Sequence, residues 1–109
     1  MLQPIEEHHV IDAQGNPAGG ETRGKGIEIF WQNGPLGRGA DRKAPNGAFV
    51  EGVIAAALGR MEFYQTASHK RFACRENALV ITKLEEALHW CQHRTTAREA
   101  RQVEGTHQV

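Results

Sequence analysis

Residues 78–95, ALVITKLEEALHWCQHRT, decide the fold of this chain. Apolar or small side chains recur in this stretch at steps of three and four residues, the spacing of one face of an α-helix. Neither proline nor glycine occurs from residue 72 to residue 104. We therefore predict one long helix over residues 74–101, followed by a tail at residues 102–109. The positions on its apolar face are Ala78, Ile81, Leu84, Leu88, Cys91 and Thr95.

The stretch before this helix predicts another, more apolar helix over residues 46–66. Asn46 is a good N-cap residue, because its side chain can accept a hydrogen bond from a free N–H of the first turn. The connector between the helices, residues 66–71, is short, and short connectors join helices that lie antiparallel. We therefore predict a two-helix hairpin. Apolar residues of its first helix are Phe49, Val50, Val53, Ile54, Ala57, Leu58 and Met61.

Residues 1–45 carry a different pattern and are expected to form a β and loop region. Residues 1–26 are rich in Gly, His and Glu, which predicts irregular or weakly paired backbone with one short extended piece at residues 10–11. Residues 27–31, IEIFW, are mostly apolar and β-branched or aromatic, which predicts a strand. The 109 residues are expected to form one α+β domain, too small to cover all its apolar side chains without self-association.

The composition excludes several classes of protein. Thirteen basic and thirteen acidic residues give a formal net charge of zero, whereas a binder of long nucleic acids usually carries a basic excess. Two cysteines, Cys74 and Cys91, are too few for a disulfide scaffold and too far apart for a redox pair. The sequence has no basic, apolar leader and no run of about twenty apolar residues. We expect a soluble, cytoplasmic chain that binds no membrane.

Arginines crowd the end of the second predicted helix and point to an anionic ligand. Arg94, Arg98 and Arg101 follow one another at i, i+4 and i+7, so they project within roughly sixty degrees of one helix line. A guanidinium binds phosphate oxygens bidentately and stacks on flat rings, which favours a nucleotide. The alternative is a solvated charged face, because cations are favoured near helix C-termini. A glycine-rich loop with three cations, residues 36–43, also suits an anion but lacks the ending of a P-loop.

Four sequence blocks carry a family resemblance. The blocks are RENA at 75–78, ITKLEEA at 81–87, RTTARE at 94–99 and EGTH at 104–107. Together they resemble the first-described family of phage Thoeris anti-defence sponge proteins. The resemblance implies a small N-terminal antiparallel β-sheet followed by two long helices, in a homo-oligomer that is a dimer or a hexamer. It also implies a protein that is not an enzyme and needs no cofactor or metal.

The function that the resemblance implies is capture of an immune signal in the cytoplasm of the infected bacterial host. Family members sequester glycocyclic ADP-ribose, which TIR-domain enzymes of Thoeris defence produce, without cleaving it. Some members also capture the cyclic dinucleotides or trinucleotides of CBASS defence. The alternative function is a phage structural or protein-interaction hairpin without a nucleotide ligand.

The resemblance also assigns roles to particular residues. It makes Phe63 a stacking platform for adenine, lets Asn77 bond the base or ribose, and places Arg94 and Arg98 on the pyrophosphate. Arg75 and Arg101 are further candidates for ligand contact. Asn77 and Arg94 are about 25 Å apart along one helix, too far for one compact ligand to touch both within a single chain. The resemblance implies a pocket that is shared between protomers. The chain departs from the family pattern in a longer connector and at position 102, where Gln replaces the usual glycine.

Each of these residues also has a structural interpretation. Phe63 is more often a core residue than a platform, and Tyr64 competes with it for either role. Asn77 could instead cap the second helix. Trp90 is expected to be buried between the helices or at an interface.

A nucleotide-processing enzyme is the remaining class, and it has the weakest support. His89 and His93 have the i, i+4 spacing of a zinc-binding pair, but a third ligand would have to come from Cys74, Cys91 or a distant His. Adjacent carboxylates at residues 85–86 face different directions and make a poor acid and base pair. We therefore expect binding without catalysis.

Overall fold

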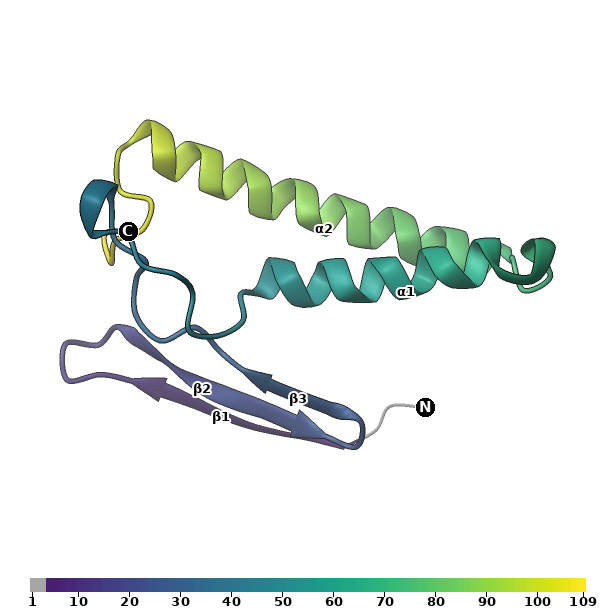
Figure 1. Cartoon of the computed structure of the whole chain (residues 1–109), viewed down its shortest axis with the longest axis horizontal. Helices are drawn as coiled ribbons and strands as arrows, with labels where there is room; N and C mark the ends of the chain where they lie inside the picture. The colour runs from purple at the N-terminus through teal and green to yellow at the C-terminus, as the bar shows by residue number, and fades with distance from the viewer. Residues whose placement is uncertain (1–3) are drawn as a thin grey trace. The chain divides into compact units, whose positions relative to one another are not determined.

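The computed structural model describes residues 4–109, which divide into two compact units (Figure 1). The first, here called the sheet unit, consists of the described residues up to Phe49 together with Arg98–Val109. The second, here called the helical unit, is Val50–Ala97. The prediction of one domain stays a prediction. The elements in chain order are β1 (Ile5–Ile11), β2 (Pro17–Gly24), β3 (Ile27–Phe30), the 3₁₀-helix η1 (Gly39–Asp41), α1 (Val50–Lys70) and α2 (Arg75–Ala100).

The three strands form an antiparallel sheet in the order β1-β2-β3. His8 of β1 faces Glu21 of β2, and Thr22 of β2 faces Ile29 of β3. The α+β class with a small antiparallel sheet is thus confirmed. The prediction of irregular backbone before residue 27 is wrong for the described residues, and residues 1–3 lie outside them. The strands β1 and β2 were not predicted because their residues are mostly polar. Backbone hydrogen bonds join the two strands, and these bonds do not require apolar side chains.

Close backbone approach and one side-chain bond stabilise the sheet. Gly20 has a φ of +123°, and a Cβ there would overlap the carbonyl oxygen of His8. Thr22, only 5% exposed, is the one buried residue in the described part of the chain. Its hydroxyl oxygen accepts a hydrogen bond of 2.8 Å from the indole Nε1 of Trp31. The sheet unit is therefore centred on a polar contact rather than on an apolar core.

The segment after β3 is tied to the segment before α1 by two side-chain amides. Oε1 of Gln32 accepts from the N–H of Asn46 at 2.8 Å and from that of Gly47 at 3.2 Å. The Asn46 side chain in turn binds the backbone of Asn33. Its Oδ1 accepts a hydrogen bond of 2.8 Å from the Asn33 N–H, and its Nδ2 donates one of 2.9 Å to the Asn33 carbonyl. The predicted N-cap at Asn46 is wrong, since this amide pairs with a distant segment and α1 begins at Val50.

The helical unit is an antiparallel pair of helices, as the apolar periodicity predicts (Figure 1). Half-buried positions recur at three- and four-residue steps along both helices, although none is fully buried. Neither helix is both long and apolar enough to cross a membrane, as far as the described residues go. The half-buried stripe comprises Ile54, Leu58, Met61 and Gln65 in α1, and Asn77, Ile81, Leu84, Leu88, Cys91 and Thr95 in α2.

The turn of the hairpin is closed by one side chain. Oε1 of Gln65 accepts a hydrogen bond of 2.9 Å from the N–H of Cys74, and Nε2 of Gln65 donates one of 3.2 Å to the carbonyl of Cys74. Helical backbone angles cease at Ala67, whose ψ is 150°. The next three residues, 68–70, all have positive φ, between 52° and 65°. The connector is thus a loop of residues in the left-handed conformation, and the two hydrogen bonds between Gln65 and Cys74 close its base.

Candidate functional site

Phe63 lies on an exposed aromatic face of α1. Its side chain is 51% exposed, and its ring centroid lies 5.9 Å from that of Tyr64. The guanidinium of Arg60 lies over both rings, 4.7 Å from the Phe63 centroid and 4.9 Å from the Tyr64 centroid. Nε of Arg60 also donates a hydrogen bond of 3.1 Å to the Tyr64 hydroxyl. Phe63 is therefore not a core residue in this chain, and its ring is accessible for stacking.

Asn77 lies in the first turn of α2 rather than at its cap. Cys74 precedes the helix, and its carbonyl accepts the N–H of Ala78 at 3.2 Å. The backbone N–H of Asn77 reaches the sulfur of Cys74 at 3.4 Å, and Nδ2 of Asn77 donates to the carbonyl of Phe72 at 3.4 Å. The side-chain oxygen of Asn77 has no hydrogen-bond donor among residues 4–109. That oxygen remains available to a ligand.

The hairpin brings Phe63 and Asn77 to the same end but not to the same face. Both lie close in sequence to the Gln65 and Cys74 contact that closes the turn. At about 100° per residue, however, Phe63 lies on the side of α1 opposite its half-buried stripe. Asn77 belongs to the half-buried stripe of α2. A hairpin brings the ends of its helices together, but it does not place these two side chains side by side.

Arg75 and Arg94 are exposed arginines whose side chains form no ion pair or hydrogen bond with the described residues. Arg75 is the first residue of α2. Arg94 lies seventeen positions beyond Asn77, about 25 Å at 1.5 Å per residue, so one compact ligand cannot reach both within one chain. Both guanidiniums keep their full donor capacity for an external anion.

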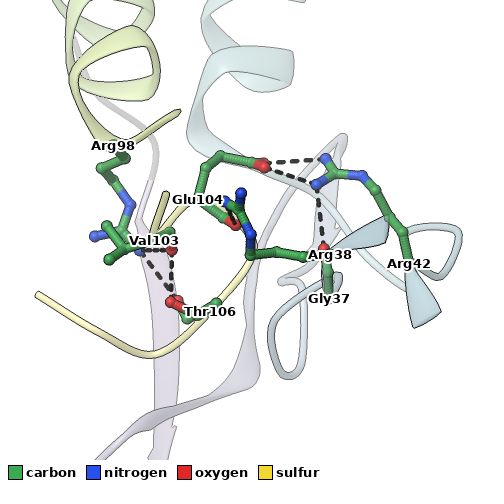
Figure 2. Close-up of polar contacts among 7 residues, drawn as sticks. All are labelled: Gly37, Arg38, Arg42, Arg98, Val103, Glu104 and Thr106. Atoms are coloured by element: carbon green, nitrogen blue, oxygen red, sulfur yellow. Dashed lines mark hydrogen bonds and ion pairs between the residues drawn. The ribbon is translucent and has the colours of Figure 1, made fainter. Parts of the chain in front are cut away.

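Arg98 differs from Arg94 because its guanidinium holds the C-terminal tail (Figure 2). It is half-buried and donates hydrogen bonds to three carbonyls: Gln108 at 2.7 Å, Val103 at 3.0 Å and Thr106 at 3.1 Å. Arg101 lies one residue beyond α2 and donates to the backbone oxygen of Val109 at 2.8 Å. The arginines that the helix spacing groups together therefore have different surroundings, and only Arg94 is unengaged.

The same tail docks against the glycine-rich loop that sequence analysis associated with anions (Figure 2). Arg42 forms a two-pronged ion pair with Glu104, with N···O distances of 2.7 and 3.0 Å. Arg38 donates to the Glu104 carbonyl at 3.2 Å. The Gly37 N–H donates to the carbonyl of Gly105 at 2.8 Å. Two of the three cations of the loop thus hold the tail.

This ion pair shifts the titration of both partners. The hydrogen bond from Arg42 lowers the pKa of the Glu104 carboxyl below its usual 4.5, although desolvation acts in the opposite direction. The same hydrogen bond raises the pKa of Arg42. The pair is only partly shielded from water, so its effect on stability is modest.

The end of α2 has a backbone conformation that suits glycine at position 102. The N–H of Gln102 donates to the carbonyl of Glu99 at 3.0 Å, and the N–H of Val103 donates to that of Arg98 at 3.0 Å. These two bonds form a Schellman motif, in which the residue after the C-cap, here Gln102, adopts a left-handed conformation. Gln102 has a φ of 61° there, a conformation that glycine adopts without steric cost.

Trp90 is 65% exposed, so the prediction that it lies between the helices of one chain is wrong. Its ring meets those of His89 and His93 edge-on, with centroids 5.6 and 5.4 Å away. No group of three or more potential metal ligands occurs among residues 4–109. The two histidines therefore flank an aromatic ring on the outer face of α2.

Comparison with known proteins identifies the hairpin. Residues 24–96 match the family model described as the Acb2/Tad1 hairpin domain. The chain belongs to the Acb2/Tad1 hairpin family. It is also 44% identical over 85 residues to Thoeris anti-defense 1 of Bacillus phage SBSphiJ7, and the alignment covers 78% of this chain and 55% of that protein. The chain therefore spans about half the length of this curated relative. The family resemblance found in the sequence is confirmed.

Some features of this Acb2/Tad1 hairpin escaped sequence reasoning. Arg60 was missed, although its i, i+3, i+4 spacing from Phe63 and Tyr64 is a readable signal for contact on a helix. The ion pair between Arg42 and Glu104 joins residues 62 positions apart, and no local pattern reveals it. The family match ends at residue 96, before Arg98 and Arg101.

Proposed function

We propose that this chain binds and sequesters the cyclic ADP-ribose signal of Thoeris defence without cleaving it. The observation that carries the proposal is the 44% identity to Thoeris anti-defense 1, which spans 85 residues. The region that matches the family model includes Phe63, Asn77 and Arg94. A sponge performs no chemistry, so its action depends on affinity, slow release and the number of molecules present.

The exposed groups of the hairpin support this function. Phe63 offers an accessible ring, and stacking of a base on an aromatic side chain contributes about 1–3 kcal/mol. Arg94 offers a guanidinium without a partner among the described residues, and such a group binds phosphate oxygens bidentately. Asn77 offers a free amide oxygen to a base or ribose.

The spacing of these groups favours a pocket shared between copies of the chain. Phe63 and Asn77 lie at the turn of the hairpin, and Arg94 lies about 25 Å further along α2. A second copy can supply Arg94 to the Phe63 end of the first. Leu79 and Trp90 are exposed and lie on the side of α2 away from its half-buried stripe, which suits a contact between copies. We propose a homo-oligomer, a dimer or a hexamer.

The remaining candidate arginines take secondary places in this proposal. Arg75 is unengaged and lies at the same end of α2 as Asn77. Arg98 and Arg101 already donate to carbonyls of the tail, so each reaches a ligand only with its remaining N–H donors. We assign the pyrophosphate first to Arg94, with Arg98 and Arg101 next to it.

The test is calorimetric titration of the purified protein with glycocyclic ADP-ribose, followed by heat release of the ligand and chromatography. We expect submicromolar binding and recovery of the intact ligand. Phe63→Ala and Arg94→Ala should each weaken binding, whereas Lys83→Ala, which removes a charge from an exposed pair with Glu86, should not. Recovery of a cleaved product would indicate an enzyme instead.

Cyclic dinucleotides and trinucleotides belong in the same titration as proposed further ligands. Light scattering coupled to gel filtration would give the number of chains in the complex. An absence of heat with every cyclic ADP-ribose isomer and every cyclic oligonucleotide would contradict the sponge. The exposed Trp90 face would then favour a hairpin that binds proteins.

A further inference from the structure

We propose that Arg60 makes the Phe63 platform selective for nucleotides over nucleosides, by donating to a phosphate that lies beside the stacked base. The inference deepens the proposed function, because it rests on Phe63 being the stacking surface. It adds a residue that the sequence analysis did not place in the site. Discrimination between a nucleotide and a nucleoside then depends on a phosphate that lies close to the base of the ligand.

The side chain of Arg60 is held in a defined orientation. Its Nε–H donates to the Tyr64 hydroxyl at 3.1 Å, and its guanidinium lies within 5 Å of both ring centroids, at 4.7 Å for Phe63 and 4.9 Å for Tyr64. Two rings and one hydrogen bond fix the plane of the group, so little side-chain entropy is left to lose on binding. Arg60 is therefore preorganised on the platform.

The terminal nitrogens of Arg60 have no acceptor among residues 4–109. This distinguishes Arg60 from other arginines of the chain. Arg23 also lies over a ring, that of Phe30, but it forms an ion pair with Glu21 at 2.7 Å. Arg42 is paired with Glu104. Within the described part of the chain, Arg60 alone combines a position over two rings with a full set of unused Nη donors.

The chemistry of such a group favours a flat ring joined to an anion. The aromatic faces attract the cation and remove part of its hydration, which strengthens its attraction to an added phosphate. A base that stacks on the free surface of Phe63 carries its ribose and phosphate along the helix surface, within reach of the Nη donors. A nucleoside gains the stacking but not the charge-assisted bonds.

The experiment is an NMR titration of the full chain with AMP and with adenosine, observing the Arg60 Nε–H and the Phe63 ring. AMP and adenosine should both shift the NMR signals of the Phe63 ring, and only AMP should shift the signal of the Arg60 Nε–H. Arg60→Met retains most of the aliphatic stem and removes the charge. Arg60→Met should weaken the binding of AMP about tenfold, the equivalent of one charge-assisted hydrogen bond, and leave the affinity for adenosine unchanged.

Arg71 provides the matched control, because its guanidinium lies 5.1 Å from the Phe72 centroid but next to no second ring. Arg71→Met should leave the preference for AMP over adenosine as in the unmodified chain. Equal affinity of the unmodified chain for AMP and adenosine, or an unchanged preference in Arg60→Met, would overturn the inference. A retained AMP preference without any binding of glycocyclic ADP-ribose would instead contradict only the proposed function.

Discussion

Half-buried side chains repeat every three or four residues along the helical unit, whereas the side-chain contacts that stabilise the sheet unit occur singly and follow no repeat. Leu84 and Leu88 are typical of the first pattern. The bond from Trp31 to Thr22 and the ion pair between Arg42 and Glu104 are typical of the second. Burial that repeats with the helix period can be predicted from the sequence, whereas a single contact between two side chains is found only in the structure. The two units should therefore respond in opposite ways to the same kind of substitution.

The largest expected effect comes from adding one methyl group to each unit. Gly20→Ala places a Cβ against the carbonyl oxygen of His8 at a φ that alanine avoids, and should destabilise the sheet unit by about 3 kcal/mol. Gly59→Ala in α1 meets nothing within 4 Å and should stabilise the helix by about 0.5–1 kcal/mol. Urea unfolding followed by circular dichroism measures both. If both substitutions changed the free energy of unfolding by the same amount and in the same direction, the two units would not differ in their response to an added methyl group.

Much of the helical unit could be predicted because its energetics depend on periodic burial. Ile81, Leu84, Leu88, Cys91 and Thr95 lie on the predicted apolar face and are half-buried, whereas Ala78 of the same predicted face is exposed and its neighbour Asn77 is half-buried instead. The strand β1 could not be predicted from residues such as Glu7 and His8, since its side chains are exposed and backbone hydrogen bonds join it to β2. The strand β2 has mostly half-buried positions, but its glycines and polar residues show no apolar alternation. Only the family resemblance predicted the sheet.

The second effect separates two arginines of the same helix. Arg98→Met removes three hydrogen bonds from the guanidinium to carbonyls of the tail and should destabilise the sheet unit by about 2 kcal/mol. Arg94→Met removes no such bond and should leave the melting temperature unchanged, while weakening the ligand. Thermal melts and calorimetry on both variants check this. A lower melting temperature in Arg94→Met would show that Arg94 is structural too.

The third effect tests the junction at the end of α2. Gln102→Gly relieves the left-handed conformation at the residue after the helix and should stabilise the chain by about 1 kcal/mol. The same substitution in the helix interior, Gln92→Gly, should destabilise by about 1 kcal/mol. Chemical unfolding of both variants gives the two signs. A loss of stability in Gln102→Gly would mean that its side chain contributes more than the strain costs.

The smallest effect is the pH dependence of the loop and tail contact. The pKa of Glu104 is lowered in the folded state, so the ion pair stabilises the chain fully above the unfolded pKa of 4.5. This contribution is lost as the pH falls from there through the lowered folded pKa. Glu104→Gln should therefore be less stable than the unmodified chain at neutral pH, with a difference that shrinks in acid. The Gly37 and Gly105 amide shifts report the contact.

Glu85→Gln is the control for this pH effect, because Glu85 forms no ion pair with residues 4–109. Its stability profile against pH should follow that of the unmodified chain. If the difference between Glu104→Gln and the unmodified chain stays constant down to acid pH, the ion pair is not the cause of the destabilisation.

The candidate site was predictable in its residue types and not in its arrangement. Helix spacing aligns Arg94 with Arg98, but only the structure shows that Arg98 holds the tail. Hairpin topology puts Phe63 and Asn77 at one end, and only the burial pattern shows that they face different ways. Side-chain direction depends on packing around each helix, which the residue order does not specify.

The double hydrogen bond between the Gln65 side chain and the Cys74 backbone separates the helices from their connector. Because this contact fixes where the chain leaves α1 and enters α2, the residues between them contribute little to the register of the hairpin. Insertions and deletions can accumulate there without displacing Phe63 or Asn77. This loop can therefore change in length without moving either helix, and in this chain it holds three consecutive residues with positive φ.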